Sequence, residues 1–129
     1  MVPGHAKVCL VLGASAGIGV NVATRYYEAG MVVCLCRRSD QNGLNKSIDA
    51  LQADGRTAHG FIVDAVKPGV VESLVEGIEK DIGEIEVVVC NLGAQIGNRS
   101  LDETSLKTFE LGWRKGCEGV FRLAKALKL

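Results

Sequence analysis

The chain has 129 residues, a length that suits one domain of ordinary size. Hydrophobic residues make up 47% and charged residues 23%, a balance that favours a packed core over disorder. Basic and acidic residues number 15 each, so no net charge attracts nucleic acid or an anionic membrane. No apolar run is long enough to span a bilayer, and the N-terminus has no hydrophobic signal core, so we expect a cytoplasmic protein.

The five cysteines show no metal-ligating or redox spacing. None forms a C-x-x-C pair, and four of them, Cys9, Cys34, Cys36 and Cys90, lie in apolar runs. In such a run cysteine behaves as a small buried hydrophobe. We therefore expect plain core thiols, and no metal site is predicted.

Buried strands and amphipathic helices alternate along the chain. A continuous apolar run over residues 8–12 predicts a strand that is buried on both faces. Beyond Gly17 the apolar spacing becomes helical, and it ends at Gly30, which suits the left-handed end of a helix. The face predicted to point inward consists of Ile18, Val22, Tyr26 and Ala29.

The same alternation repeats three more times. Predicted strands cover residues 31–36, 59–65 and 85–90, and Gly55 and Gly83 end the helices before the last two of them. Pro68 suits the first turn of a helix. Apolar positions predict helices over residues 44–51, 71–82 and 106–127, the last of them opened by a cap at Thr104 or Ser105.

Four strand–helix units in succession predict an α/β protein. Units of this length build a parallel sheet with right-handed crossovers and helices on both faces. The loops after the strands then meet at one edge of the sheet, where proteins of this class bind ligands. Because no linker or shift in composition interrupts the alternation, residues 1–129 are expected to form a single domain.

Three glycines, Gly13, Gly17 and Gly19, stand in the first strand-to-helix turn, which reads GASAGIG. Missing side chains let backbone N–H groups approach a pyrophosphate, and the helix N-terminus adds partial positive charge. Gly13 permits the tight turn, Gly19 lets the helix pack close to the sheet, and Ser15 offers a hydroxyl to a phosphate or ribose. We therefore predict a phosphate site here rather than a turn alone. No Gly-Lys-Ser/Thr follows, which excludes a P-loop.

With this loop in place, the sequence resembles the short-chain dehydrogenase/reductase family. G-x-x-x-G-x-G follows the first strand, Asp64 follows the third, and residues 90–93 stand for the family's N-N-A-G motif, with Asn91 and Gly93 retained. The resemblance implies a Rossmann-type doubly wound parallel sheet of strand order 3-2-1-4, truncated here before the fifth strand. It also implies an NAD(P)-binding oxidoreductase that acts on a small-molecule alcohol or carbonyl substrate, with Asp64 at the adenine.

The end of the second strand selects between the two pyridine dinucleotides. A free ribose favours an acidic acceptor there, whereas a 2′-phosphate favours a cation. Arg37 and Arg38 occupy this place, with no acidic residue before Asp40, so we predict NADP(H) over NAD(H). The alternatives are that the arginines only solvate the strand end, that Asp64 only caps a turn, and that Asn91 only holds the loop.

No catalytic residue is assigned. The family's Y-x-x-x-K pair supplies an acid/base tyrosine and a lysine, and neither Tyr26 nor Tyr27 is followed by lysine at that spacing. Gly116 also stands where the family often carries an asparagine that supports a proton relay. The predicted cofactor-binding residues are Gly13, Ser15, Gly17, Ile18, Gly19, Arg37, Arg38, Asp64, Ala65, Asn91 and Gly93.

Three functions stay open from the sequence. The first is an NADP(H)-dependent oxidoreductase represented by its cofactor-binding half, and the second is a non-catalytic module that binds a dinucleotide or a protein. The third is a related α/β domain that binds another nucleotide. Residues 95–100 are expected to border the site without identifying a substrate. The fourth strand is expected to form an apolar sheet edge. The last helix, through Phe109, Trp113 and Phe121, either covers the sheet or drives formation of a homo-oligomer.

Overall fold

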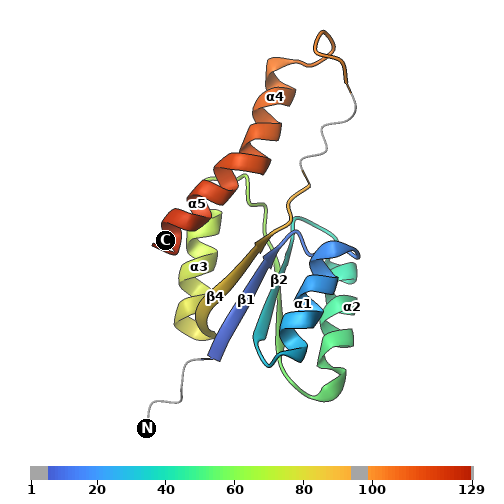
Figure 1. Cartoon of the computed structure of the whole chain (residues 1–129), viewed down its shortest axis with the longest axis vertical. Helices are drawn as coiled ribbons and strands as arrows, with labels where there is room; N and C mark the ends of the chain where they lie inside the picture. Colours follow the sequence, from blue (N-terminus) through green and yellow to red (C-terminus); the bar gives the residue numbers. More distant parts are fainter. Residues whose placement is uncertain (1–5, 94–98, 129) are drawn as a thin grey trace.

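The computed structural model describes residues 6–93 and 99–128 (Figure 1). One parallel sheet has the strand order β3-β2-β1-β4, which confirms the Rossmann-type order predicted from the sequence. The strands are β1 (Ala6–Leu12), β2 (Val32–Arg37), β3 (Ala58–Ile62) and β4 (Gly83–Cys90). The helices are α1 (Ile18–Glu28), α2 (Gln41–Leu51), α3 (Val70–Asp81), α4 (Leu106–Trp113) and α5 (Gly119–Ala126), with a 3-10 turn at Gln52–Asp54 and a π-helical segment at Arg114–Glu118.

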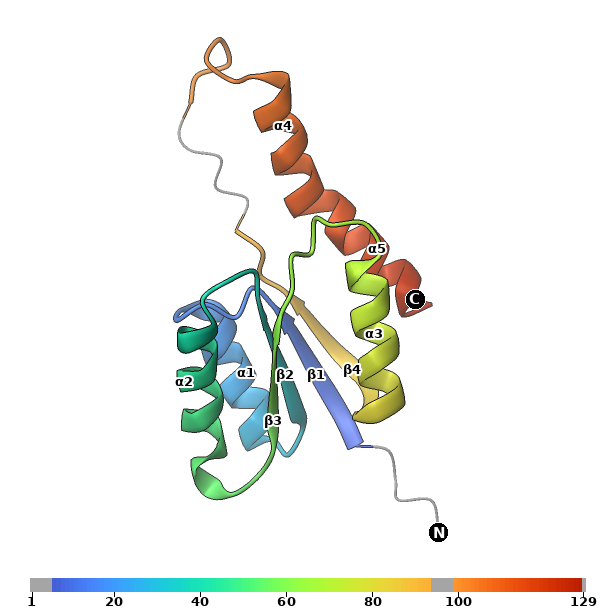
Figure 2. The ribbon, with the colours of Figure 1, turned by 180° about the vertical axis from the view of Figure 1, so that it is seen from behind.

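Two helical layers enclose the sheet. Helices α1 and α2 cover one face, and α3 and α5 cover the other (Figures 1 and 2). The side chains of β1 alternate between the two layers, because successive residues of a strand point to opposite faces. Val8, Leu10 and Leu12 pack on the α3 side, and Cys9 and Val11 pack on the α1 side. Burial on both faces explains why this strand reads as an unbroken apolar run.

Helix α1 buries a different face from the one predicted. Ile18 is 71% exposed and Ala29 is exposed, so the prediction that these two residues point into the core was wrong, whereas Tyr26 is half-buried and packs against the core. The physical reason lies at Gly19, where a Cβ would come within 2.5 Å of the Gly13 carbonyl oxygen. This close approach turns Gly19 toward the sheet and sets the rotation of the helix. The buried residues are Gly19, Ala23 and Tyr27.

Three further details of the predicted elements were wrong. Pro68 lies before α3, which is capped by Gly69 at a left-handed φ of 77°. Gly83 begins β4 rather than ending α3, and a Cβ there would overlap the carbonyl oxygen of Ala6 on the neighbouring strand. Cys90 is exposed rather than a core thiol, because it is the last residue of β4, an edge strand of the sheet.

The last predicted helix is interrupted. Ser105 caps α4 as predicted, since its hydroxyl accepts the N–H of Thr108 at 3.1 Å. The π-helical segment separates α4 from α5, and α5 lies beside α3 and buries Leu123 while α4 extends away from the sheet (Figure 2). The three aromatic side chains that were predicted either to cover the sheet or to drive self-association are exposed to solvent. Phe109 is 65%, Trp113 52% and Phe121 67% exposed.

Candidate functional site

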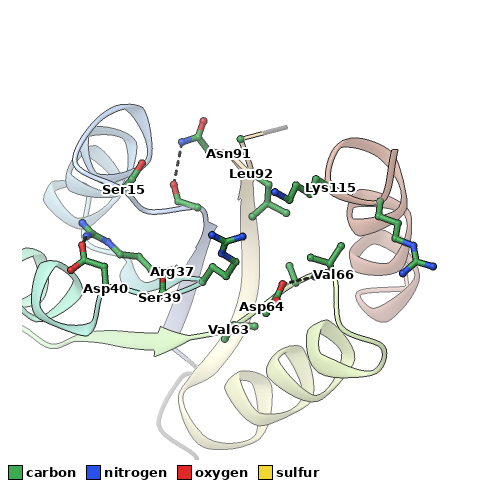
Figure 3. A pocket seen from close by; sticks show the side chains of 15 residues that line it. Ser15, Arg37, Ser39, Asp40, Val63, Asp64, Val66, Asn91, Leu92 and Lys115 are labelled. Atoms are coloured by element: carbon green, nitrogen blue, oxygen red, sulfur yellow. Dashed lines mark hydrogen bonds and ion pairs between the residues drawn. The ribbon is translucent and has the colours of Figure 1, made fainter. Parts of the chain in front are cut away.

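A pocket of about 370 Å³ lies where the carboxyl ends of the strands meet (Figure 3). The loops after β1, β2 and β3, the segment after β4 and the π-helical segment form its walls. Gly17, Ile18 and Gly19 do not line it, since Gly17 and Ile18 are exposed at the start of α1 and Gly19 is buried beneath the loop. The predicted site residues that do line it are Gly13, Ser15, Arg37, Arg38, Asp64, Ala65, Asn91 and Gly93.

The loop between β1 and α1 is held against β2 by its backbone. The N–H groups of Gly13 and Ala14 both donate to the carbonyl oxygen of Cys36, at 3.0 and 2.9 Å. Gly13 has a φ of +81°, and a Cβ there would overlap the backbone carbonyl of Asn91. Glycine is therefore required at position 13 both for its backbone conformation and for the space beside β4.

Gly17 serves a different purpose in the same loop. It is the N-cap of α1, and a Cβ added there would meet no atom within 4 Å. The first N–H groups of a helix have no partner within the helix and carry partial positive charge. The first turn of α1 contains no acidic residue that would occupy these donors. The open space in front of Gly17 therefore suits an anion such as a phosphate.

Asn91 holds the glycine loop from the β4 side. Its side-chain Nδ2 donates to the Gly13 carbonyl oxygen at 3.2 Å, and its backbone N–H donates to the Leu12 carbonyl oxygen at 2.9 Å. Figure 3 shows the amide directed at the loop. The structure thus shows that Asn91 holds the loop through its side chain, which was one of the alternatives left open by the sequence. Asn91 also lines the pocket.

Asp64 lies two residues beyond β3, which ends earlier than predicted. Its Oδ1 accepts the N–H of Val66 at 3.2 Å, and its carbonyl oxygen accepts the N–H of Lys67 at 3.1 Å. Asp64 therefore does close a turn, as the alternative proposed. Its second carboxylate oxygen has no hydrogen bond among the residues that the structure describes, and the side chain lines the pocket (Figure 3).

The two arginines after β2 have different surroundings. The Arg37 side chain is only 9% exposed, and its Nε donates to the Ala14 carbonyl oxygen at 2.6 Å. Its other nitrogens contact Asp40 at 2.6 Å and Ser47 at 3.2 Å, so Arg37 braces the glycine loop against α2. Arg38 is exposed and lines the pocket, and within the described chain no hydrogen bond or ion pair engages its side chain. The donors of Arg38 are therefore available to a ligand.

Sequence reasoning missed a group of pocket residues. Lys115 is the most consequential of them, because it points from the π-helical segment toward Leu92 at the end of β4 (Figure 3). Its neighbour Arg114 pairs with Glu110 at 2.8 Å and with Glu118 at 3.8 Å. A lysine on a helix gives no sequence signal of this kind. The missed residues are Ser39, Asp40, Val63, Val66, Leu92, Arg114 and Lys115.

The cysteines beneath the site are neutral core thiols, as predicted for three of them. Burial raises the pKa of Cys9 to about 11 and that of Cys34 to about 12, and it raises the pKa of Cys36 further. Within residues 6–93 and 99–128 no cluster of His, Cys, Asp and Glu could hold a metal ion. In the same ranges, no helix combines the length and apolarity needed to cross a membrane.

Neither tyrosine lies at the pocket. Tyr27 lies in the last turn of α1, at the opposite end of that helix from the glycine loop, and its hydroxyl donates to Asp54 at 2.8 Å. Tyr26 is half-buried against the core on the α1 side of the sheet. Of residues 95–100, predicted to border the site, positions 95–98 lie outside the described residues.

The parallel sheet with helices on both faces and a pocket at the carboxyl ends of its strands define a Rossmann-type α/β protein, and comparison with known proteins gives the family. The family model described as short chain dehydrogenase matches residues 7–128, so the chain belongs to the short-chain dehydrogenase family. The chain is 32% identical over 124 residues to FabG of Escherichia coli K12, a 3-oxoacyl-acyl-carrier-protein reductase. That match covers 94% of this chain and 48% of FabG.

Solved structures give the same result for the fold. L-sorbose reductase from Gluconobacter frateurii, in complex with NADPH and L-sorbose, superposes with a TM-score of 0.85 at 25% identity, over 95% of this chain and 46% of the reductase. NAD⁺-bound xylitol dehydrogenase superposes with a TM-score of 0.84 at 26% identity, over 94% of this chain and 46% of the dehydrogenase. The chain thus spans about half the length of the relatives it matches.

Proposed function

We propose that this chain is the dinucleotide-binding part of an NADP(H)-dependent oxidoreductase that interconverts a small alcohol and its carbonyl compound. One observation carries the proposal: Gly13 and Ser15 of the glycine loop, together with Arg38 and Asp64, line a single pocket at the carboxyl ends of the strands. Membership of the short-chain dehydrogenase family and the NADPH bound in L-sorbose reductase support it. When bound, the nicotinamide ring supplies or accepts the hydride.

Different residues of the described chain would bind different parts of such a cofactor. The N-terminus of α1, in front of Gly17, would hold the pyrophosphate, because its N–H groups have no acidic side chain beside them in the first turn. Ser15 is exposed beside it and offers its hydroxyl to a phosphate or ribose. Asp64 presents its second carboxylate oxygen to the adenine side. Gly13, Gly19 and Asn91 act on the cofactor through the shape of the loop.

Arg38 is the residue that we expect to select NADP(H) over NAD(H). The charge of Arg37 is already matched by Asp40 at 2.6 Å, whereas Arg38 has its planar set of donors available for a 2′-phosphate. The two solved relatives bind different dinucleotides, NADPH in one and NAD⁺ in the other. The expectation of NADP(H) for this chain therefore rests on Arg38.

The test is calorimetric titration of the purified chain with NADPH, NADH and ATP, with circular dichroism to establish that it is folded. One charge-assisted interaction contributes about 1.5–3 kcal/mol, so NADPH should bind roughly 10- to 100-fold more tightly than NADH. Equal affinities would overturn the assignment of NADP(H) and leave a pyridine dinucleotide. A folded chain that binds none of the three would overturn the proposed function.

We also propose that the exposed aromatic side chains of α4 and α5 contact a second copy of the chain. Phe109, Trp113 and Phe121 expose more than half of their surface, and exposed aromatic side chains of this kind mark association sites. Sedimentation equilibrium should then show a concentration-dependent dimer. The doubly substituted variant Phe109→Glu, Phe121→Glu should stay monomeric at the same concentrations. A monomeric wild-type chain would contradict the proposal.

A further inference from the structure

Arg122 connects the last helix to the loop that carries Asp64. It lies in α5, and its side chain is only 13% exposed. Its Nη1 donates to the carbonyl oxygen of Ala65 at 3.2 Å, and its Nη2 donates to the carbonyl oxygen of Lys67 at 3.0 Å. Both carbonyl groups belong to the turn that begins at Asp64, so one guanidinium fixes two points of this turn, of which Ala65 lines the pocket.

Glu72, on helix α3, accepts hydrogen bonds from the same Arg122 guanidinium. Arg122 Nε donates to Oε1 of Glu72 at 3.0 Å and Nη2 donates to Oε2 at 2.8 Å, a two-point contact that fixes the plane of the guanidinium. Glu72 lies in the first turn of α3. The Arg122 guanidinium lowers the pKa of Glu72 to about 2, which keeps this carboxylate charged. Arg122 therefore locks α5, the start of α3 and the loop between β3 and α3 together.

We propose that Arg122 is a positioning residue for the adenine side of the cofactor pocket. The hydrogen bonds within residues 64–67 fix the shape of the turn, because Asp64 accepts the N–H groups of Val66 and Lys67. The hydrogen bonds within the turn do not fix its position relative to α5, whereas the contacts of Arg122 with Ala65 and Lys67 fix that position. Arg122 thereby determines where the second carboxylate oxygen of Asp64 faces the pocket. The inference rests on the proposed function.

The chemistry of adenine makes this role separable from general stability. A carboxylate oxygen accepts a hydrogen bond from the exocyclic amino group of adenine. Hypoxanthine carries a carbonyl oxygen at the same ring position and cannot donate there. Correct placement of Asp64 therefore favours NADPH over its hypoxanthine analogue, and a misplaced Asp64 loses that preference. With one charge-assisted hydrogen bond at stake, the preference of the wild-type chain should be about tenfold.

The test measures the affinity ratio of NADPH to its hypoxanthine analogue by calorimetry in three variants. Arg122→Gln should reduce the ratio from about 10 to about 1, while Arg122→Lys, which cannot contact both carbonyls and Glu72 together, should leave about 3. Arg56→Gln is the matched control, since Arg56 also braces two elements, through Asp54 and the Tyr27 carbonyl, outside the pocket. This control should keep the wild-type ratio even where it lowers stability.

Each result decides the matter. A wild-type ratio in Arg122→Gln, or in Arg122→Lys where the glutamine variant does not fold, would overturn the positioning role. Equal changes in the Arg122 and Arg56 variants would show that both act only on stability. A wild-type chain that binds NADPH but not in preference to the analogue contradicts this inference alone. A folded wild-type chain that fails to bind NADPH contradicts the proposed function, and the inference with it.

Discussion

The side-chain amide of Asn91 donates to the carbonyl oxygen of Gly13 at 3.2 Å, across 78 residues of sequence. This contact extends the pairing of β1 with β4 beyond the strands, because the Asn91 backbone N–H also bonds to Leu12. It makes the geometry of the glycine loop depend on the segment that follows β4.

Replacing Asn91 should therefore weaken both the fold and the cofactor site. Asn91→Leu should lower the free energy of unfolding by about 1–2 kcal/mol in urea denaturation, because a half-buried carbonyl loses its donor. NADPH affinity should fall at the same time. Asn21→Ala is the matched control: Asn21 also donates from its amide to a loop carbonyl, that of Gly17 at 2.9 Å, but at an exposed position. Equal effects of the two substitutions would contradict the bridging role of Asn91.

The glycines of the loop should respond differently to the same added methyl group. Gly13→Ala combines a left-handed φ of +81° with overlap against Asn91, so the variant should lose more than about 2 kcal/mol of stability. Gly17→Ala meets no atom within 4 Å and should lose only about 1 kcal/mol, because alanine is a poorer N-cap residue than glycine. It should nevertheless bind NADPH more weakly, because the new methyl group stands in the space assigned to phosphate. Wild-type NADPH affinity in Gly17→Ala would contradict the assignment of the phosphate to the space in front of Gly17.

Arg37 and Arg38 should separate stability from selectivity. Arg38→Gln should lower NADPH affinity by roughly 10- to 100-fold and leave NADH affinity and the urea midpoint nearly unchanged, since only a 2′-phosphate needs that cation. Arg37→Gln removes the brace to Ala14 and Asp40, and it should lower stability and the affinities for both dinucleotides together. A selective loss of NADPH binding in Arg37→Gln would assign the 2′-phosphate to Arg37 instead.

Stability should fall in acid because of a carboxylate outside the pocket. Hydrogen bonds from Arg56, and one from Tyr27, lower the pKa of Asp54 from 3.8 to about 2. The unfolded chain therefore takes up this proton first, so the stabilisation by Asp54 is complete above about pH 4 and is lost as the pH falls toward 2. Asp54→Asn should be less stable than wild type at pH 7, and the difference should shrink in acid. A difference that does not change with pH would contradict this assignment.

The alternation of strands and helices was predictable from the sequence because buried parallel strands and amphipathic helices have different apolar periods, whereas the spatial order of the strands was implied by the resemblance to the short-chain dehydrogenase/reductase family. The rotation of α1 was not predictable, because Ile18 and Ala29 fit a helical stripe as well as Gly19, Ala23 and Tyr27 do. Only the approach of Gly19 to the Gly13 carbonyl, a contact made in three dimensions, decides between the two faces.

The candidate site was predictable where a motif carries the chemistry, as in the glycine loop and Asp64. The different environments of Arg37 and Arg38 were not predictable, because they depend on contacts of Arg37 with Asp40, the N-cap of α2, and with Ser47 within α2. Lys115 could not be placed, because a π-helical turn holds an extra residue and rotates the following helix by about 100° relative to a regular one. Apolar positions on either side of that turn therefore cannot be read as one stripe.

The position of β1 within the sheet has a consequence for the order of folding. Val8 pairs with Val32 on one side and with Ile85 on the other. During synthesis β1 can pair with β2 early, but its second edge stays open until β4 has been made. Closing so long a loop is slow, and an open apolar edge can pair with the wrong strand meanwhile. The arrival of residues 83–90 at β1 should therefore limit the folding rate, and newly made chains that have not reached this point should be the ones prone to aggregation.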